Sequence, residues 1–178
     1  MTQNILVGPH AVLEALRAGR RKIERIFLAR EENDSRIAEI IRLAKLKGVP
    51  VKHEGRGRLD VLAKPFAHQG VLAEVGEAGY NDPFELAARI KATTPLPLLV
   101  LLDGIQDPQN LGAILRAGEA AGADGLFISK HRAVGITPAV ARASAGAVEY
   151  LPVAQVPGLA AFLEWLKQKG IWILGADP

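Results

Sequence analysis

An unbroken run of aliphatic residues at positions 98–102 is the feature that most limits how this chain can fold. A strand with one solvent-exposed face alternates between apolar and polar residues, whereas a continuous apolar run is typical of a strand buried on both faces of a parallel sheet. Parallel strands need crossover connections, which are usually helices. The run therefore predicts an α/β architecture with helices on both faces of a sheet.

The sequence after this run continues the alternation of helix and strand. The expected elements are a helix from the Asp107-Pro108 pair to Ala121, strands at residues 125–129, 148–153 and 171–174, a helix that opens at Thr137-Pro138, and a helix over residues 159–169. Trp165 and Trp172 are expected in the core. The order predicts a doubly wound parallel sheet.

Residues 1–76 show a second alternation of strand and helix, on a smaller scale. Strands are expected at residues 5–7, 23–29, 49–52 and 71–75, and helices at residues 11–17, after the Asp34-Ser35 cap, and at residues 58–63. Residues 77–97 are expected to hold a linker and one helix, which begins at Asp82-Pro83. The predicted organisation is a small α/β domain over residues 1–76 and a second α/β domain over residues 98–178.

Composition excludes several classes of site. The chain has no cysteine, so disulfides, thiolate catalysis and cysteine-based zinc sites are excluded. No two histidines have metal-ligand spacing, and no metal site is expected. No signal peptide or membrane span is recognised, so we expect a cytoplasmic protein without a membrane partner. Residues 1–76 hold 14 Lys and Arg against 9 Asp and Glu, which suggests a polyanion partner; an ordinary solvated surface is the alternative.

The segment between Asp103 and Arg116 carries the clearest chemistry. It follows the buried strand, where open α/β sheets bind ligands, and it starts a helix whose first N–H groups can face an anion. Gly112 allows close approach of a ligand or a backbone, and the Arg116 guanidinium suits a phosphate or a ribose hydroxyl. The alternative is structural: Asn110 caps the helix and Arg116 pairs with Glu119.

Four segments in this order resemble those of the SpoU, or TrmH, family of RNA 2′-O-ribose methyltransferases. They are Asp103-Gly-x-x-Asp107-Pro-x-Asn110-x-Gly112-x-x-x-Arg116, Arg142-Ala-Ser144-Ala-Gly146-Ala-Val-Glu149, Gly8-x-His10-Ala-Val-x-Glu14, and His68-Gln69-Gly70-Val71. The resemblance covers nearly the whole chain, and the last two segments are most similar to the rRNA guanosine methyltransferases of this family.

The resemblance implies an RNA-binding first domain like ribosomal protein L30e and a second domain of the SPOUT type, an α/β fold with a trefoil knot. It implies S-adenosylmethionine as cofactor, Asn110 and Arg116 at the catalytic site, and a homodimer. Ser144 and Gly146 are candidate cofactor contacts, with tight helix packing as the alternative. The family's later signatures do not occur in these 178 residues. We therefore expect the second domain to be truncated before the knot and this chain alone to be inactive.

The implied partner is RNA, with 23S rRNA ahead of tRNA and guanosine as the expected nucleotide. The candidate RNA contacts are His10, Arg17, Arg20, Arg21, Lys22, Arg25, Arg56, Arg58 and His68. For the arginines the alternative is a solvated face, and for His10 a helix cap. A non-catalytic RNA-binding protein remains a rival interpretation. An ordinary nucleotide-binding α/β enzyme is disfavoured, because Lys130-His131-Arg132 stands where an acidic ribose-binding residue is expected.

Overall fold

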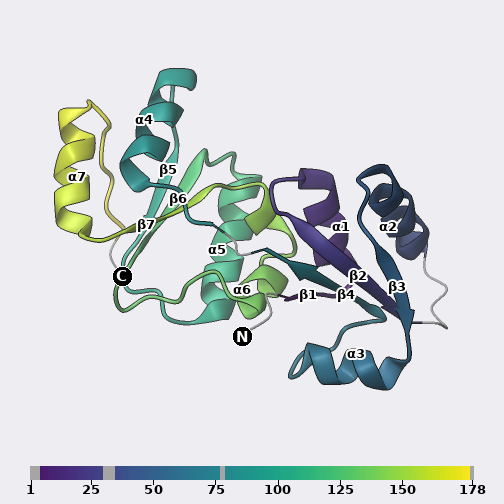
Figure 1. Ribbon diagram of the computed structural model, residues 1–178. Helices are drawn as coiled ribbons and strands as arrows, with labels where there is room; N and C mark the ends of the chain where they lie inside the picture. The colour runs from purple at the N-terminus through teal and green to yellow at the C-terminus, as the bar shows by residue number, and fades with distance from the viewer. Residues whose placement is uncertain (1–4, 30–34, 77–78, 177–178) are drawn as a thin grey trace.

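The computed structural model describes residues 5–29, 35–76 and 79–176, which form two β-sheets side by side (Figure 1). Their strand orders are β1-β4-β2-β3 and β5-β6-β7. The strands are β1 (Ile5–Val7), β2 (Ile23–Ala29), β3 (Val51–Glu54), β4 (Val71–Val75), β5 (Leu99–Leu102), β6 (Gly125–Ser129) and β7 (Val153–Val156). The helices are α1 (Pro9–Ala18), α2 (Ser35–Leu46), α3 (Arg56–Ala63), α4 (Pro83–Thr93), α5 (Pro108–Ala120), α6 (Pro138–Ala143), the short 3-10 helix η1 (Ala147–Glu149) and α7 (Leu159–Gln168).

The first half, residues 5–76, is a mixed sheet with helices on both faces. β4 pairs antiparallel with β1 and with β2, and β2 pairs parallel with β3. α1 and α2 cover one face and α3 covers the other (Figure 1). The predicted bounds of β2 and β4 are confirmed, and the predicted α/β class holds for this half. The predicted Asp34 cap of α2 lies outside the described residues.

The second half, residues 79–176, is a three-layer structure around a parallel sheet. β6 pairs parallel with β5 and with β7. α5 and α6 pack on one face of this sheet, and α4 and α7 pack on the other (Figure 1). Asp82 caps α4 as predicted, because its carboxylate accepts from the backbone N–H groups of Phe84 and Glu85. The predicted parallel sheet with helices on both faces is confirmed.

The apolar run at residues 98–102 is less buried than its composition suggests. All four residues of β5 are half-buried, whereas the first four residues of β6 are fully buried. β5 is an edge strand of the described sheet, with β6 as its sole hydrogen-bonded neighbour there. A strand forms at these residues as predicted. The strand that is buried on both faces, however, is β6 and not β5.

The predicted strand at residues 148–153 is wrong. Gly146 adopts a left-handed conformation (φ 93°) and starts η1, and the Leu151 N–H donates to the Ala147 carbonyl. Ala147 and Leu151 are four residues apart and both are buried against α5, which is the spacing of a helical turn. The strand begins only at Val153, where β7 pairs with β6.

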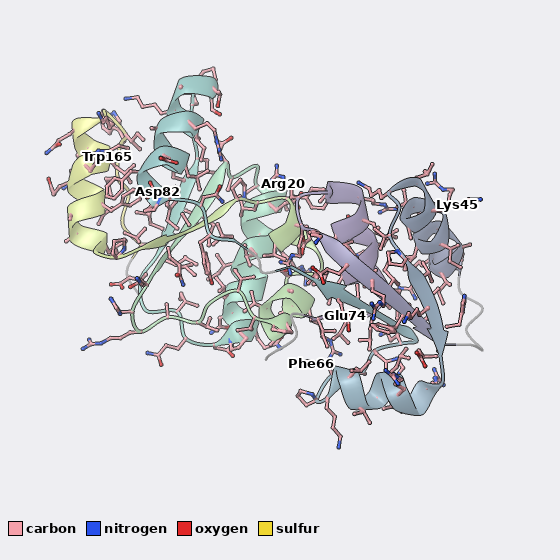
Figure 2. All side chains as sticks on the ribbon, in the orientation of Figure 1. Arg20, Lys45, Phe66, Glu74, Asp82 and Trp165 are labelled. Atoms are coloured by element: carbon pink, nitrogen blue, oxygen red, sulfur yellow. The ribbon has the colours of Figure 1, made fainter. Side chains whose placement is uncertain are left out.

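The predicted strand at residues 171–174 is also absent, and so is the predicted burial of Trp172. Trp172 is 98% exposed and Leu174 is 97% exposed. An apolar segment becomes a strand only where another strand offers backbone partners, and none of the described strands pairs with these residues. Trp165, labelled on α7 in Figure 2, does pack against the core as predicted. Its ring lies against those of Phe84 and Phe162.

Candidate functional site

The start of α5 is fixed by Asp107. Its carboxylate accepts a hydrogen bond from the Asn110 backbone N–H at 3.0 Å, and Pro108 occupies the first helical position. The predicted helix start is confirmed, and the alternative in which Asn110 provides the cap is wrong. The Asn110 side chain is exposed in the first turn, just beyond the carboxyl end of β5, where a ligand can reach it.

Gly112 is the point where α5 touches α6. A methyl group added at Gly112 would lie 2.3 Å from the Ala143 Cβ and 2.8 Å from the Ala143 carbonyl carbon. Real side chains do not approach so closely, so only glycine fits at the observed separation of the two helices. The close approach expected at Gly112 is therefore made by a backbone of the same chain.

Arg116 lies two turns into α5 and lines a hollow of about 630 Å³. Glu14, Ser144, Gly146 and Tyr150 also line this hollow, so both halves of the chain contribute to it. The structure thus brings Arg116 together with Ser144 and Gly146, and it leaves Asn110 outside the lining. Within the described part of the chain the Arg116 guanidinium has no hydrogen bond or ion pair, so the pairing with Glu119, which was the structural alternative, is not formed.

The two candidate cofactor contacts do not fit that role. The Ser144 side chain is fully buried and its hydroxyl donates to the Ala141 carbonyl at 2.9 Å. Gly146 is covered by Glu14, whose Cγ would lie 2.6 Å from an added methyl group. These contacts favour close packing, the alternative that the sequence left open, over contact with S-adenosylmethionine.

Glu14 and Tyr150 join the halves beside Arg116. The Tyr150 hydroxyl donates to Glu14 Oε2 at 2.6 Å, and Arg17 donates to Glu14 Oε1 at 2.7 Å. Burial and the nearby Glu14 carboxylate raise the pKa of the Tyr150 hydroxyl to about 12. Sequence reasoning did not assign either residue to the site, because a contact across 136 positions leaves no local pattern in the sequence.

The basic segment between Arg17 and Arg25 is largely engaged within the protein. Arg20 donates to the Tyr150 carbonyl, and it lies where the two halves meet (Figure 2). Arg21 forms an ion pair with Glu149 at 3.2 Å, and the two side chains are only 10% and 3% exposed. Arg21 is therefore an interior contact between the halves and does not present its charge to solvent as the RNA prediction requires.

The other members of that segment also have acidic partners. Arg17 bonds Glu14 and Glu39, Lys22 lies 3.4 Å from Glu24, and Arg25 lies 3.7 Å from Glu74. The Glu39 hydrogen bond is the main cause of a raised Arg17 pKa. These side chains stay partly exposed, so an RNA phosphate would compete with their carboxylate partners.

The remaining candidates for RNA contact differ in exposure. His10 is exposed on α1, and Arg56 and Arg58 are exposed on α3, where Arg58 lies 3.9 Å from Glu54. His68 is buried: its Nε2 lies 3.0 Å from an Asp60 carboxylate oxygen, and its Nδ1 accepts from the Gly70 N–H at 2.9 Å. His68 therefore stabilises the turn before β4, and its prediction as an exposed RNA contact does not fit the structure.

The structure shows two further negative features. Among the described residues no three His, Cys, Asp or Glu side chains are grouped so that they could hold a metal ion. No helix in that part of the chain has the length and apolar character to span a membrane.

Comparison with known proteins places these features in a class. The fold aligns with the AdoMet-bound rRNA methyltransferase from Sinorhizobium meliloti at a TM-score of 0.70 and 22% sequence identity, over 93% of this chain. The chain spans 58% of the length of that solved structure. The two chains therefore share a fold.

The chain belongs to the SpoU family of RNA methyltransferases, as its motifs suggested. Residues 97–178 match the profile of the SpoU rRNA Methylase family, and residues 5–80 match that of the RNA 2′-O ribose methyltransferase substrate-binding region. A protein of Bacillus subtilis named YacO, assigned to the TrmH family of tRNA/rRNA methyltransferases, is 38% identical over 97% of this chain and 68% of its own length. The 23S rRNA (guanosine-2′-O-)-methyltransferase RlmB of Shewanella oneidensis is 38% identical over 97% of this chain and 70% of its own length.

Proposed function

We propose that this chain belongs to an enzyme that methylates the 2′-hydroxyl of a ribose in RNA, with S-adenosylmethionine as methyl donor. The observation that carries the proposal is the free Arg116 guanidinium in a hollow lined by both halves of the chain. An unpaired arginine beside a large hollow can receive a phosphate or a ribose hydroxyl without first breaking an ion pair. No described residue is assigned to the cofactor.

The proposed target is a guanosine in 23S rRNA, and tRNA is the alternative. Support for rRNA comes from the Shewanella relative, and the Bacillus relative leaves tRNA open. We propose that residues 1–76 bind the RNA, that residues 77–97 connect the domains, and that residues 98–178 form part of a knotted SPOUT domain. We also propose that Asn110 acts with Arg116 and that the enzyme works as a homodimer.

The decisive experiment is transfer of labelled methyl from S-adenosylmethionine to 23S rRNA fragments and to tRNA. It is run with this chain and with the product of the whole gene. Arg116→Ala is expected to lower transfer by about a hundredfold or more in whichever protein is active, a typical effect for a positioned catalytic group. Lys169→Ala is the matched control, because Lys169 is exposed on the opposite side of the second sheet.

Two outcomes would contradict the proposal in different ways. If Arg116→Ala transferred methyl groups at the unchanged rate, Arg116 would have no role in catalysis. Absence of transfer by both proteins, with RNA still bound, would favour the rival function, an RNA-binding protein without catalysis.

A further inference from the structure

Three consecutive basic residues, Lys130, His131 and Arg132, follow β6, the central strand of the second sheet. We name them the basic loop. All three side chains are exposed, and none forms a hydrogen bond or ion pair with a residue that the structure describes. The cations of the segment between Arg17 and Arg25, by contrast, are engaged by carboxylates or a carbonyl. The charges of the basic loop are therefore available to an anionic ligand.

Hydrogen bonds hold the backbone of the basic loop in place. The Lys130 N–H donates to the Val156 carbonyl at 2.9 Å, and the Ser129 hydroxyl donates to the His131 carbonyl at 2.8 Å. Arg132 adopts a left-handed conformation (φ 56°), which residues other than glycine rarely take. Such a conformation persists only where the surrounding structure holds it, and it is concentrated at functional sites. The basic side chains are therefore carried by a fixed and strained backbone.

The basic loop lies at the edge of the sheet where Asn110 is found. The Val134 N–H, just after the loop, donates to the Ile105 carbonyl at 2.8 Å, and Ile105 belongs to the segment that leads from β5 to Asn110 in α5. β5 and β6 are parallel, so their carboxyl ends meet at this edge, where open α/β sheets bind ligands. The Asp103 side chain is exposed at the same edge, yet it forms no ion pair with the described cations of the loop. The edge thus combines unpaired cations with a candidate site residue.

We propose that the basic loop binds phosphates of the substrate RNA next to the ribose that is methylated. The Arg132 guanidinium offers a planar set of donors that matches phosphate oxygens, and the Lys130 ammonium adds a second positive charge. Contacts to phosphates fix the register of a nucleic acid and read no base. The loop therefore positions the RNA at the edge that carries Asn110. This inference rests on the proposed function, because that function makes RNA the ligand.

The test measures binding of this chain to a 23S rRNA fragment at several salt concentrations. The loop variant, Lys130→Ala/Arg132→Asn, removes two positive charges, and asparagine tolerates the left-handed backbone. Each lost phosphate contact lowers the magnitude of the slope of log K against log salt by about 0.7 to 0.9, so the loop variant should lose roughly 1.4 to 1.8. Binding to tRNA should show the same loss, because phosphate contacts carry no sequence information. Lys130→Arg/Arg132→Lys keeps both charges and should keep the slope.

The matched control is Lys91→Ala/Lys169→Ala, which also removes two exposed cations. Lys91 and Lys169 line one pocket near the C-terminal ends of α4 and α7. Because α4 leads into the start of β5, this pocket lies at the opposite end of the sheet from the basic loop. The control should leave the slope unchanged, and equal slopes for the loop variant and the control would overturn the inference. If the loop variant fails to fold, Lys130→Ala alone decides, with an expected loss of about 0.7 to 0.9.

Methyl transfer by the product of the whole gene separates this inference from the proposed function. The loop variant should raise KM for RNA and leave kcat nearly unchanged, since a phosphate contact holds the substrate and the transition state alike. Methyl transfer together with an unchanged salt slope in the loop variant contradicts only the role of the basic loop. A flattened slope without transfer by any protein contradicts only the proposed function. If the unsubstituted protein binds neither RNA, both are wrong.

Discussion

Arg21 and Arg116 were both candidate site residues in the sequence, but the structure places them in opposite environments. Arg21 sits in a basic segment and was expected to face RNA, yet it is buried in an ion pair with Glu149. Arg116 has Glu119 one turn away on the same helix, yet its guanidinium is open to a hollow and has no partner among the described residues. A local charge pattern therefore does not show whether a charged side chain is free to bind a ligand.

The same contrast separates the two halves of the chain. In the first half, the arginines of the segment between Arg17 and Arg25 bond carboxylates or a carbonyl, and two of them reach residues about 130 positions away. In the second half, α5 turns Gly112 and Leu115 inward and leaves Arg116 outside. The basic segment between Arg17 and Arg25 therefore stabilises the junction of the halves, whereas Arg116 is available to bind a substrate.

The largest expected effect is the loss of stability in Arg21→Ala. Removing one member of a buried ion pair leaves the other charge without compensation, which costs about 3 kcal/mol of unfolding free energy. Arg116→Ala should change that free energy by less than about 0.5 kcal/mol, because Arg116 is exposed and unpaired. Urea denaturation measures the unfolding free energy of both variants. Equal values for the two would contradict the assignment of Arg21 as a buried structural residue and Arg116 as an unpaired exposed one.

The pH dependence of Arg21→Ala sharpens this prediction. The folded-state pKa of Glu149 is raised by burial, so folding favours its neutral form. The stability that depends on neutral Glu149 is fully present below the unfolded pKa and falls as the pH rises through the folded pKa. Without Arg21 the carboxylate is less well compensated, so the deficit of Arg21→Ala should be smaller at pH 4 than at pH 7. A deficit that does not change between these pH values would show that lost packing, and not lost charge, is the cause.

A smaller effect is expected from Gly112→Ala, which tests whether α5 is held tightly enough to position Arg116. The added methyl group would meet Ala143 at 2.3 Å, so the helices must separate, at a net cost of about 2 kcal/mol. Gly118→Ala is the matched control on the same helix, because its nearest contact is the Leu151 side-chain end at 3.4 Å. The control should be neutral or slightly stabilising, since alanine favours helices. The midpoint of thermal unfolding is measured for both variants. An equal decrease of this midpoint in Gly112→Ala and Gly118→Ala would contradict the tight α5–α6 contact.

Much of the fold could be predicted because its signals are local. β2 and β4 have the predicted bounds, and the caps by Asp82 and Asp107 follow from residues adjacent to their helices. The strand predicted at residues 148–153 failed because Ala147 and Leu151 pack as a helical turn against α5, a tertiary contact that overrides strand propensity. Burial of β5 was overestimated for a related reason, since a sequence does not reveal which strand lies at the edge.

The site could be predicted only in part. Arg116 was found from its place after the strand and from the family motif, and the structure places it in a large hollow. The sequence did not reveal the roles of Glu14 and Tyr150, because their contact forms only when the chain folds. The same is true of the Glu149 carboxylate oxygen that has no hydrogen bond among the described residues. His68 was misjudged because a histidine that fixes a turn and a histidine that binds RNA look the same in a sequence.

The smallest expected effect concerns which cations of the first half contact RNA. Arg58 is 66% exposed and only loosely paired with Glu54, whereas the Arg21 side chain is 10% exposed. Each phosphate contact that is lost lowers the salt dependence of binding by about 0.7 to 0.9 in the slope of log K against log salt. Arg58→Ala should therefore flatten the slope for an rRNA fragment, and Arg21→Ala should leave the slope unchanged at a temperature where it is folded. If Arg21→Ala flattened the slope instead, its ion pair with Glu149 would have to open when RNA binds, and burial in the free protein would no longer identify the structural arginines.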